Sequence, residues 1–234
     1  MKKIAAAFGT CALVAFLTTV ALVSGARAAV LNFDDVCTGT VTESQPGGCN
    51  GGYAIPSNYT GGIANVTVSY LNSAGVGALQ LWRSGFNLLG NVAYNPHIGG
   101  KWSIFLTPTA GFKLNLTGFD LGVYNSLGAQ TNVRVYDINT NSNFYNVGNL
   151  NIGTDVDQGI ADEIMRFRAS WTSTAGIGIE IQDLQADRSV GIDNITFTVD
   201  PIQVVPVPVA GAGLPALLAI AGFAAWRRRV VANA

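Results

Sequence analysis

Short runs of alternating apolar and polar residues recur along the chain, separated by Gly, Asn, Pro and Ser. In one run Val66, Val68 and Tyr70 alternate with polar neighbours, and a period of two is typical of strands that bury one face. Such runs occupy residues 30–34, 66–70, 78–83, 102–106, 114–124, 132–138, 164–171, 176–182 and 195–199. No useful length of chain shows the apolar period of an amphipathic helix. The pattern predicts an all-β fold of about nine or ten strands in a two-sheet β-sandwich.

The run from Leu114 to Tyr124 changes its alternation in the middle. Apolar residues occupy even positions up to Leu116 but odd positions from Phe119 onward, and Gly118 lies at the change. An extra residue inserted in a strand shifts the alternation in this way. We therefore predict a β-bulge at Gly118.

The first residues have the pattern of a secretory signal peptide. Two lysines precede an apolar stretch over residues 4–23, and Ala26-Arg27-Ala28 has small residues at the two positions that a signal peptidase reads. Residues 1–28 are therefore predicted to be a signal peptide, so that the mature chain begins near Ala29. The alternative is a membrane-spanning anchor that is retained.

The C-terminal end combines prolines, an uncharged stretch and an arginine cluster. Residues 204–226 are 23 residues without a charge, about the length that crosses a hydrocarbon core of roughly 30 Å. Arg227, Arg228 and Arg229 follow and would stay on the cytoplasmic side. The predicted organisation is an ectodomain over 29–200, a Pro-rich linker and sorting tag over 201–208, a transmembrane helix over 209–226 and an Arg-rich cytoplasmic tail over 227–234. A permanent tail anchor is the alternative to a processed one.

This ending resembles the PEP-CTERM sorting signal of Gram-negative bacteria. The resemblance is to the Val-Pro-x-Pro variant of the tag, matched here by Val205, Pro206, Val207 and Pro208, and the namesake Pro-Glu-Pro is absent. It implies cleavage by signal peptidase and then by an exosortase-type membrane protease, with the C-terminal helix held transiently in the inner membrane. The implied destination is the cell surface or the extracellular matrix, in association with exported polysaccharide and biofilm matrix.

The ectodomain resembles jelly-roll domains that are often found in front of such sorting tails. The resemblance rests on LNFDD at residues 31–35 and VGIDNITF at residues 190–197, with a looser match over residues 105–124. Those domains are similar to carbohydrate-binding modules. The resemblance therefore implies a jelly-roll-like sandwich whose first and last strands lie side by side.

The net charge of the predicted mature domain narrows the possible binding partners. The predicted mature domain has seven Lys and Arg residues against all 14 Asp and Glu residues of the chain, which gives a net charge of 7 − 14 = −7. An acidic domain is a poor candidate for binding nucleic acid, so no nucleic acid is expected as a partner.

Cys37 and Cys49 are the two cysteines of the mature part. Export to an oxidising compartment favours a disulfide between them over two free thiols.

No catalytic motif is evident in the sequence. A nucleophile elbow of the Gly-x-Ser-x-Gly type is absent, and His97 is the one histidine of the chain. A zinc site would need several His or Cys ligands. We therefore expect no enzymatic activity, although a glycosidase, which needs two carboxylates facing a cleft, stays open as an alternative.

Calcium is the metal that the composition permits, because it takes oxygen ligands from Asp, Asn and backbone carbonyls. Asp34 or Asp35, together with Asp193 and Asn194, would form a site if the first and last strands are neighbours. The alternative is that these side chains accept backbone hydrogen bonds at turns and strand ends.

Sugar binding needs an aromatic ring presented to solvent on a rigid sheet, flanked by groups that form hydrogen bonds. Strand alternation places Gln80 and Trp82 opposite their apolar neighbours, and likewise Arg134 and Tyr136. These four residues are the predicted carbohydrate platform, on the condition that their two strands share one sheet. The alternative for Trp82 is that a loop covers it.

The leading hypothesis is an exported, surface-sorted protein without catalytic activity that binds or organises extracellular polysaccharide. A structural or adhesive matrix protein acting through protein contacts is the main alternative, and a glycan-acting hydrolase is the third.

Overall fold

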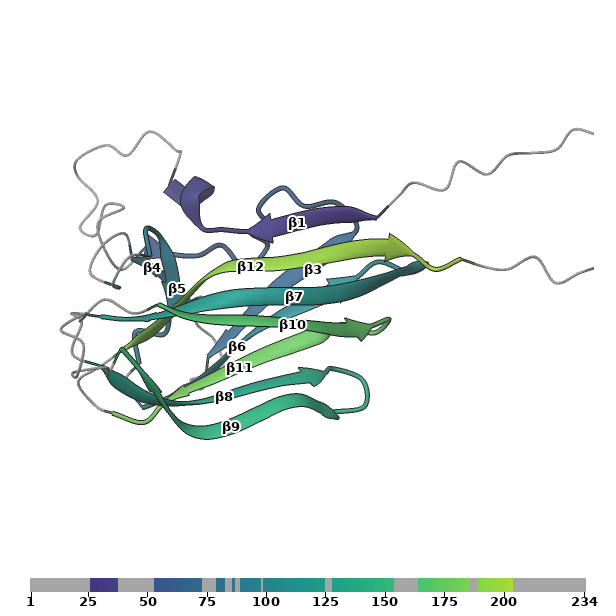
Figure 1. The fold of residues 1–234 in the computed structure, drawn as a ribbon. Helices are drawn as coiled ribbons and strands as arrows, with labels where there is room; N and C mark the ends of the chain where they lie inside the picture. The colour runs from purple at the N-terminus through teal and green to yellow at the C-terminus, as the bar shows by residue number, and fades with distance from the viewer. Residues whose placement is uncertain are drawn as a thin grey trace, which may run out of the picture.

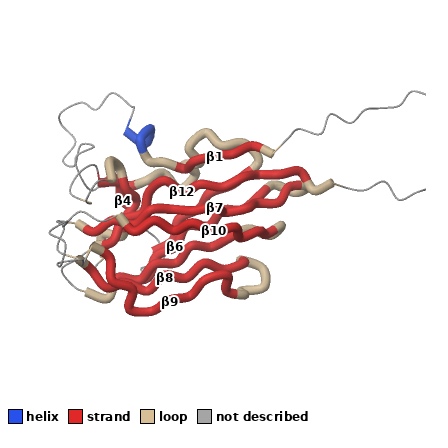
Figure 2. The backbone as a smooth tube through the Cα atoms, viewed as in Figure 1, coloured by secondary structure: helices blue, strands red, loops and turns tan. Residues whose placement is uncertain are grey.

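The chain folds into strands throughout its described part. The computed structural model describes residues 26–37, 53–72, 79–82, 86, 89–97, 99–124, 128–153, 164–185 and 189–203. These residues form twelve β-strands and one short 3-10 helix, η1 (Asp34–Cys37), in the order that Figure 1 shows. Figure 2 shows the strands as two layers with loops at both ends. The prediction of an all-β chain is confirmed for this part.

The larger sheet, sheet A, has seven strands and is antiparallel throughout its described pairs. Its order is β10 (Met165–Ser173), β7 (Phe112–Val123), β12 (Val190–Pro201), β5 (Val92–Tyr94), β4 (Gln80–Trp82) and β2 (Tyr53–Ala54). Strand β1 (Arg27–Leu31) pairs with the other half of β12.

The smaller sheet, sheet B, has five antiparallel strands. Its order is β3 (Val66–Asn72), β6 (Lys101–Pro108), β11 (Ile177–Asp183), β8 (Ala129–Asp137) and β9 (Asn143–Ile152).

The inner faces of the two sheets share one hydrophobic core, as expected for a β-sandwich. Alternate residues of the central strands point into it: Leu114, Leu116, Phe119 and Leu121 from β7 of sheet A and Trp102, Ile104 and Leu106 from β6 of sheet B are all buried. Trp102 is 1% exposed and is one of the largest side chains of this core. Trp171 is only half-buried and packs at the margin of the core.

The predicted bulge and the predicted neighbours are both confirmed. The register between β7 and β12 shifts on each side of the pair formed by Gly118 and Thr196. The first and last strands lie side by side, with Leu31 opposite Ile195 and Ala29 opposite Phe197. Strand β1 starts at Arg27, two residues before the predicted mature N-terminus. The strand ends at Leu31, whereas the predicted run extended to Asp34, because Asp34 already begins the 3-10 helix η1.

Several sequence predictions fall outside the described residues. These are the signal peptide up to residue 25, the pairing of Cys37 with Cys49, and everything from residue 204 onward, including the sorting tag and the arginine cluster. They stay predictions. Within the described ranges, no helix has the length and apolar character needed to cross a membrane.

Candidate functional site

The predicted carbohydrate platform is divided between the two sheets. Gln80 and Trp82 lie on β4 of sheet A, whereas Arg134 and Tyr136 lie on β8 of sheet B. The four side chains therefore do not form one platform. The condition that the two strands share one sheet is therefore not met. Strand alternation predicts which face a residue occupies, but it does not predict the sheet to which the strand belongs. Each half has its own surroundings.

On the outer face of sheet B, Tyr136 lies directly over Gly178 of the neighbouring strand β11. The two residues are register partners. A Cβ atom at Gly178 would come within 2.6 Å of Tyr136 Cζ and 2.8 Å of its Cε1. The ring therefore rests against the bare backbone of β11, which only glycine permits at this distance. Tyr136 keeps part of its surface exposed.

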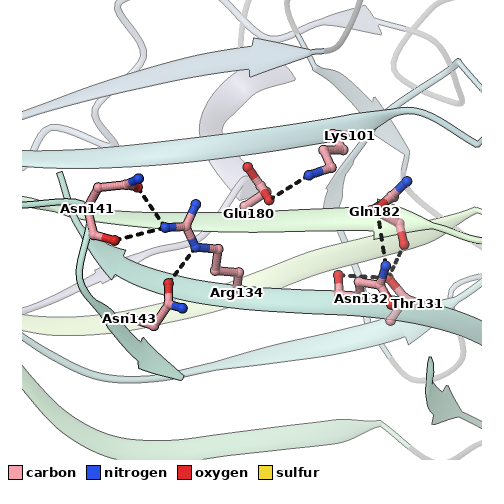
Figure 3. A network of polar contacts seen from close by, with 8 residues as sticks. All are labelled: Lys101, Thr131, Asn132, Arg134, Asn141, Asn143, Glu180 and Gln182. Atoms are coloured by element: carbon pink, nitrogen blue, oxygen red, sulfur yellow. Dashed lines mark hydrogen bonds and ion pairs between the residues drawn. The ribbon is translucent and has the colours of Figure 1, made fainter. Parts of the chain in front are cut away.

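Arg134 is held beside this ring by the β8–β9 hairpin (Figure 3). Its guanidinium carbon lies 4.1 Å from the centroid of the Tyr136 ring, within the range of a cation–π contact. Arg134 Nε donates to Asn143 Oδ1 at 2.6 Å, and Nη2 donates to Asn141 O at 3.0 Å and Asn141 Oδ1 at 2.6 Å. Asn141 has a φ of 57°, a left-handed conformation that asparagine tolerates better than most residues. The turn thus fixes the arginine before any ligand binds.

Polar side chains continue across the same face, as Figure 3 shows. Lys101 Nζ lies 3.4 Å from Glu180 Oε1, and Asn132 Nδ2 donates to Gln182 Oε1 at 3.1 Å. Burial raises the pKa of Tyr136 above its ordinary value, and the charge of Glu180 raises it further. The charge of Arg134 and a hydrogen bond with Ser103 act in the opposite direction, but the net change is upward, so the Tyr136 hydroxyl keeps its proton at neutral pH. The face combines the Tyr136 ring and the half-buried Phe105, which is the β6 register partner of Gly178, with amide, hydroxyl and charged groups.

On sheet A, Trp82 takes part in a second, smaller hydrophobic cluster. Its ring packs edge-on against Tyr94 at 5.7 Å and Tyr124 at 5.2 Å between centroids. Phe86 and Leu89, from the segment between β4 and β5, are buried in this cluster. Glycines make room for that segment on the sheet, since a Cβ at Gly122 or Gly191 would come within 2.9 Å of Phe86 or Leu89 atoms.

This packing gives Trp82 a structural role. Trp82 is half-buried, and Gln80 Oε1 accepts a hydrogen bond from the Tyr94 hydroxyl at 2.8 Å. The alternative in which a loop covers Trp82 describes it better than a free platform does. Sequence reasoning missed Tyr94 and Tyr124 because they reach Trp82 only through the sheet pairing.

The predicted calcium ligands come together on the outer face of sheet A. Asp193 is 6% exposed. Burial raises its pKa to about 7, with further contributions from the charges of Asp34 and Asp120. Asn194 Nδ2 donates to Asp120 Oδ2 at 3.1 Å, and Arg168 Nη1 lies 3.1 Å from Asp120 Oδ1. Asp193 therefore lies in a shielded position among other carboxylates.

The oxygens around Asp193 are mostly occupied. Asp34 Oδ1 accepts from Asn91 Nδ2 at 2.5 Å and Asp34 Oδ2 accepts from Asn32 Nδ2 at 3.0 Å. Asp193 Oδ1 is buried without a hydrogen-bond partner. Among the described residues, no group of three or more His, Cys, Asp or Glu side chains is arranged to hold a metal ion. A cation at this place would have to draw on Asp193, Asp34 and amide or backbone oxygens.

Comparisons with known proteins find matches among solved structures. No family model matches the chain, and no curated protein matches it. Among solved structures, the arabinose-bound α-L-arabinofuranosidase MgGH51 matches with a TM-score of 0.34 and 12% identity, over 74% of this chain and 29% of that one. The xylan-binding module CBM15 matches with a TM-score of 0.25 and 10% identity, over 59% of this chain and 97% of that one. Likenesses this distant carry no argument about the site.

Proposed function

We propose that this chain is an exported module without catalytic activity that binds or organises extracellular polysaccharide through the outer face of sheet B. The observation that carries the proposal is Tyr136, whose ring is fixed over Gly178 with Arg134 against it. A sugar ring presents an apolar C–H face and a rim of hydroxyls. The part of the Tyr136 ring that Gly178 and Arg134 leave exposed, together with the surrounding groups that donate and accept hydrogen bonds, matches both features.

Binding suits this face better than hydrolysis does. A glycosidase needs two carboxylates facing the scissile bond. Of the described residues on the outer face of sheet B, Glu180 supplies a carboxylate, and it is paired with Lys101. The hydroxyl and amide groups around Tyr136 recognise sugars without supplying a general acid and base. A matrix protein acting through protein contacts, the main alternative, would use sheet edges instead of this face.

The ends of the chain give the proposed route to the surface. Signal peptidase would cut near residue 28, and an exosortase-type protease would cut at the tag of Val205, Pro206, Val207 and Pro208, freeing a jelly-roll-like ectodomain. We expect protein released to the surface of a Gram-negative bacterium to lack everything after about Pro208. Intact mass spectrometry tests this, and a released form that retains Arg227, Arg228 and Arg229 would contradict it.

The test of the proposed function is a glycan-array screen of the purified mature protein, run with calcium and again with a chelator. We expect binding to a defined set of sugars. Tyr136→Leu keeps apolar cover over Gly178 but removes the flat ring, so the dissociation constant should rise about tenfold, or about 1.4 kcal/mol. Loss of binding or of thermal stability with the chelator would support a calcium ion held by Asp34, Asp193 and Asn194.

A matched control is Gln80→Ala, which lies on sheet A and should leave the affinity unchanged. Circular dichroism would establish that both variants are folded. Loss of binding in Gln80→Ala with full binding in Tyr136→Leu would move the site to sheet A. An absence of binding to every sugar, with calcium or without it, would exclude the proposed function.

A further inference from the structure

The edges of the two sheets differ in how well they are guarded against pairing with another strand. Exposed edges invite association, and proteins protect them with bulges, charges or short strands. Strand β9 has two register shifts against β8, and β10 has one register shift and an exposed arginine, Arg166. Strand β2 is two residues long, and the predicted mature chain keeps only residues 29–31 of β1, so both of these edge strands are short. Each of these four edges has at least one protective feature.

Strand β3, the remaining edge, has none of these features. It spans seven residues, VTVSYLN, without a charge, a glycine or a proline. Its register with β6 runs without interruption from the pair of Val66 and Pro108 to the pair of Asn72 and Trp102. Uncharged segments of this length with high β-propensity are prone to pair with their own kind. Leu71 adds an apolar side chain that is 45% exposed.

The backbone of β3 has hydrogen-bonding groups available for a further strand. Asn65 O accepts from Thr109 N at 3.0 Å, so the odd-numbered residues of β3 bond to β6. The N–H and C=O groups of the even-numbered residues then point to the open edge. Among the described residues, none makes a backbone hydrogen bond to those groups. In Figure 1, β3 lies on the same side of the sandwich as β1.

We propose that β3 pairs antiparallel with β3 of a second copy of this chain, which joins the two five-stranded sheets into one. Centred on Ser69, this pairing places Val68 opposite Tyr70 of the second copy and Thr67 opposite Leu71 of the second copy. Aromatic and β-branched pairs across strands are favourable. The mature domain carries a net charge of −7 (7 − 14), but this seam brings no two charges together. Strand β3 has no charged side chain that could attract a charged strand of another protein. Two β3 strands, by contrast, place apolar and β-branched residues opposite each other.

The pairing closes on itself. Two copies related by a two-fold axis use up both β3 edges, and each of the other edges formed by the described strands is protected, so a dimer results and not a fibre. One strand pair is a small contact compared with a stable interface of roughly 1,600 Å², so the dimer should depend on concentration. If the proposed polysaccharide surface is also correct, the dimer presents two Tyr136 faces on the same side of one sheet, which raises avidity for a repeating polymer.

The experiment measures mass against concentration by sedimentation of the mature protein, without polysaccharide, so that it does not depend on sugar binding. We expect a monomer–dimer equilibrium. Ser69→Lys should raise its dissociation constant about tenfold or more, since like charges lie opposite each other at the centre of the seam. Mixing Ser69→Lys with Ser69→Glu should restore the dimer as a mixed pair. Asn146→Lys, on the exposed side of β9, is the matched control and should have no effect.

Three results would overturn the proposal. The first is a monomer at all concentrations. The second is a dimer that Ser69→Lys leaves intact while Asn146→Lys disrupts it. The third is a mixture of Ser69→Lys and Ser69→Glu that stays monomeric although each variant shows the circular dichroism of the unaltered protein.

Discussion

The free energy of unfolding of the ectodomain is expected to fall as the pH rises from about 4 to about 7, because two buried carboxyl groups bind protons more tightly in the folded state. Burial raises the pKa of Asp183 from its ordinary value of 3.8 to about 7 and is the largest cause of the same change in Asp193. A group whose pKa is raised by folding stabilises the protein fully below its unfolded pKa. That stabilisation is lost as the pH passes through the folded pKa.

Asp183 has the simpler surroundings of the two. It is 2% exposed at the end of β11, where its Oδ1 accepts from Val190 N at 3.3 Å and its Oδ2 is buried without a partner. Once ionised, it would be a buried anion with a single weak donor, which is costly. A change in pKa of about three units corresponds to an upper bound of about 4 kcal/mol for each group.

Denaturant unfolding at intervals between pH 4.5 and pH 8 measures this slope. Asp183→Asn and Asp193→Asn should each reduce it, because an amide does not titrate in this range. Asp137 does not obscure the result: a hydrogen bond from Ser173 is the largest cause of its lowered pKa, so its contribution changes only below about pH 4. A free energy of unfolding that rises between pH 5 and pH 7, or Asn variants with an unchanged slope, would contradict the prediction.

Alternation of apolar residues predicted the strands that form the core, because these strands bury one face and expose the other. All nine predicted runs overlap observed strands. The prediction from alternation missed β9, whose sequence NFYNVGNLNI is rich in asparagine and whose residues are mostly exposed or half-buried. It also missed β5, which is too short to show a period, and its three residues are all buried. The two-residue alternation is lost in β9, whose side chains lie mostly outside the core, and in β5, which is covered on both faces.

The candidate site was only partly predictable for a similar reason. Alternation correctly placed Arg134 and Tyr136 on an outer face, but nothing local in β8 indicates that Gly178 of β11 lies beneath the ring. For the same reason, the contacts of Trp82 with Tyr94 and Tyr124 were not predicted. Contacts between strands that are distant in the sequence depend on the order of the strands in a sheet. The alternation pattern of a single sequence does not predict that order. Asp34 and Asp193 were found together because the order of the first and last strands was itself predicted.

Replacing Gly118 by alanine is expected to destabilise the ectodomain by about 3 kcal/mol, the upper part of the usual range for overpacking. A Cβ at this position would lie 2.4 Å from Phe167 O and 2.9 Å from Arg168 Nη1. The arginine end can move aside, but the carbonyl belongs to the backbone of β10, which pairs with β7 here. The alanine must therefore push β10 away from the sheet, and the contact of Arg168 with Asp120 is lost with it.

Thermal unfolding measures the loss, and about 3 kcal/mol should lower the midpoint by roughly 10 °C in a domain of this size. Gly90→Ala is the matched control, since a Cβ there meets nothing within 4 Å. Arg168→Ala combined with Gly118→Ala separates the two causes. Removing the arginine should not rescue the midpoint if the Phe167 carbonyl is the obstacle. Equal midpoints for Gly118→Ala and Gly90→Ala would instead mean that β10 can yield without cost, and that glycine at the bulge is not required by packing.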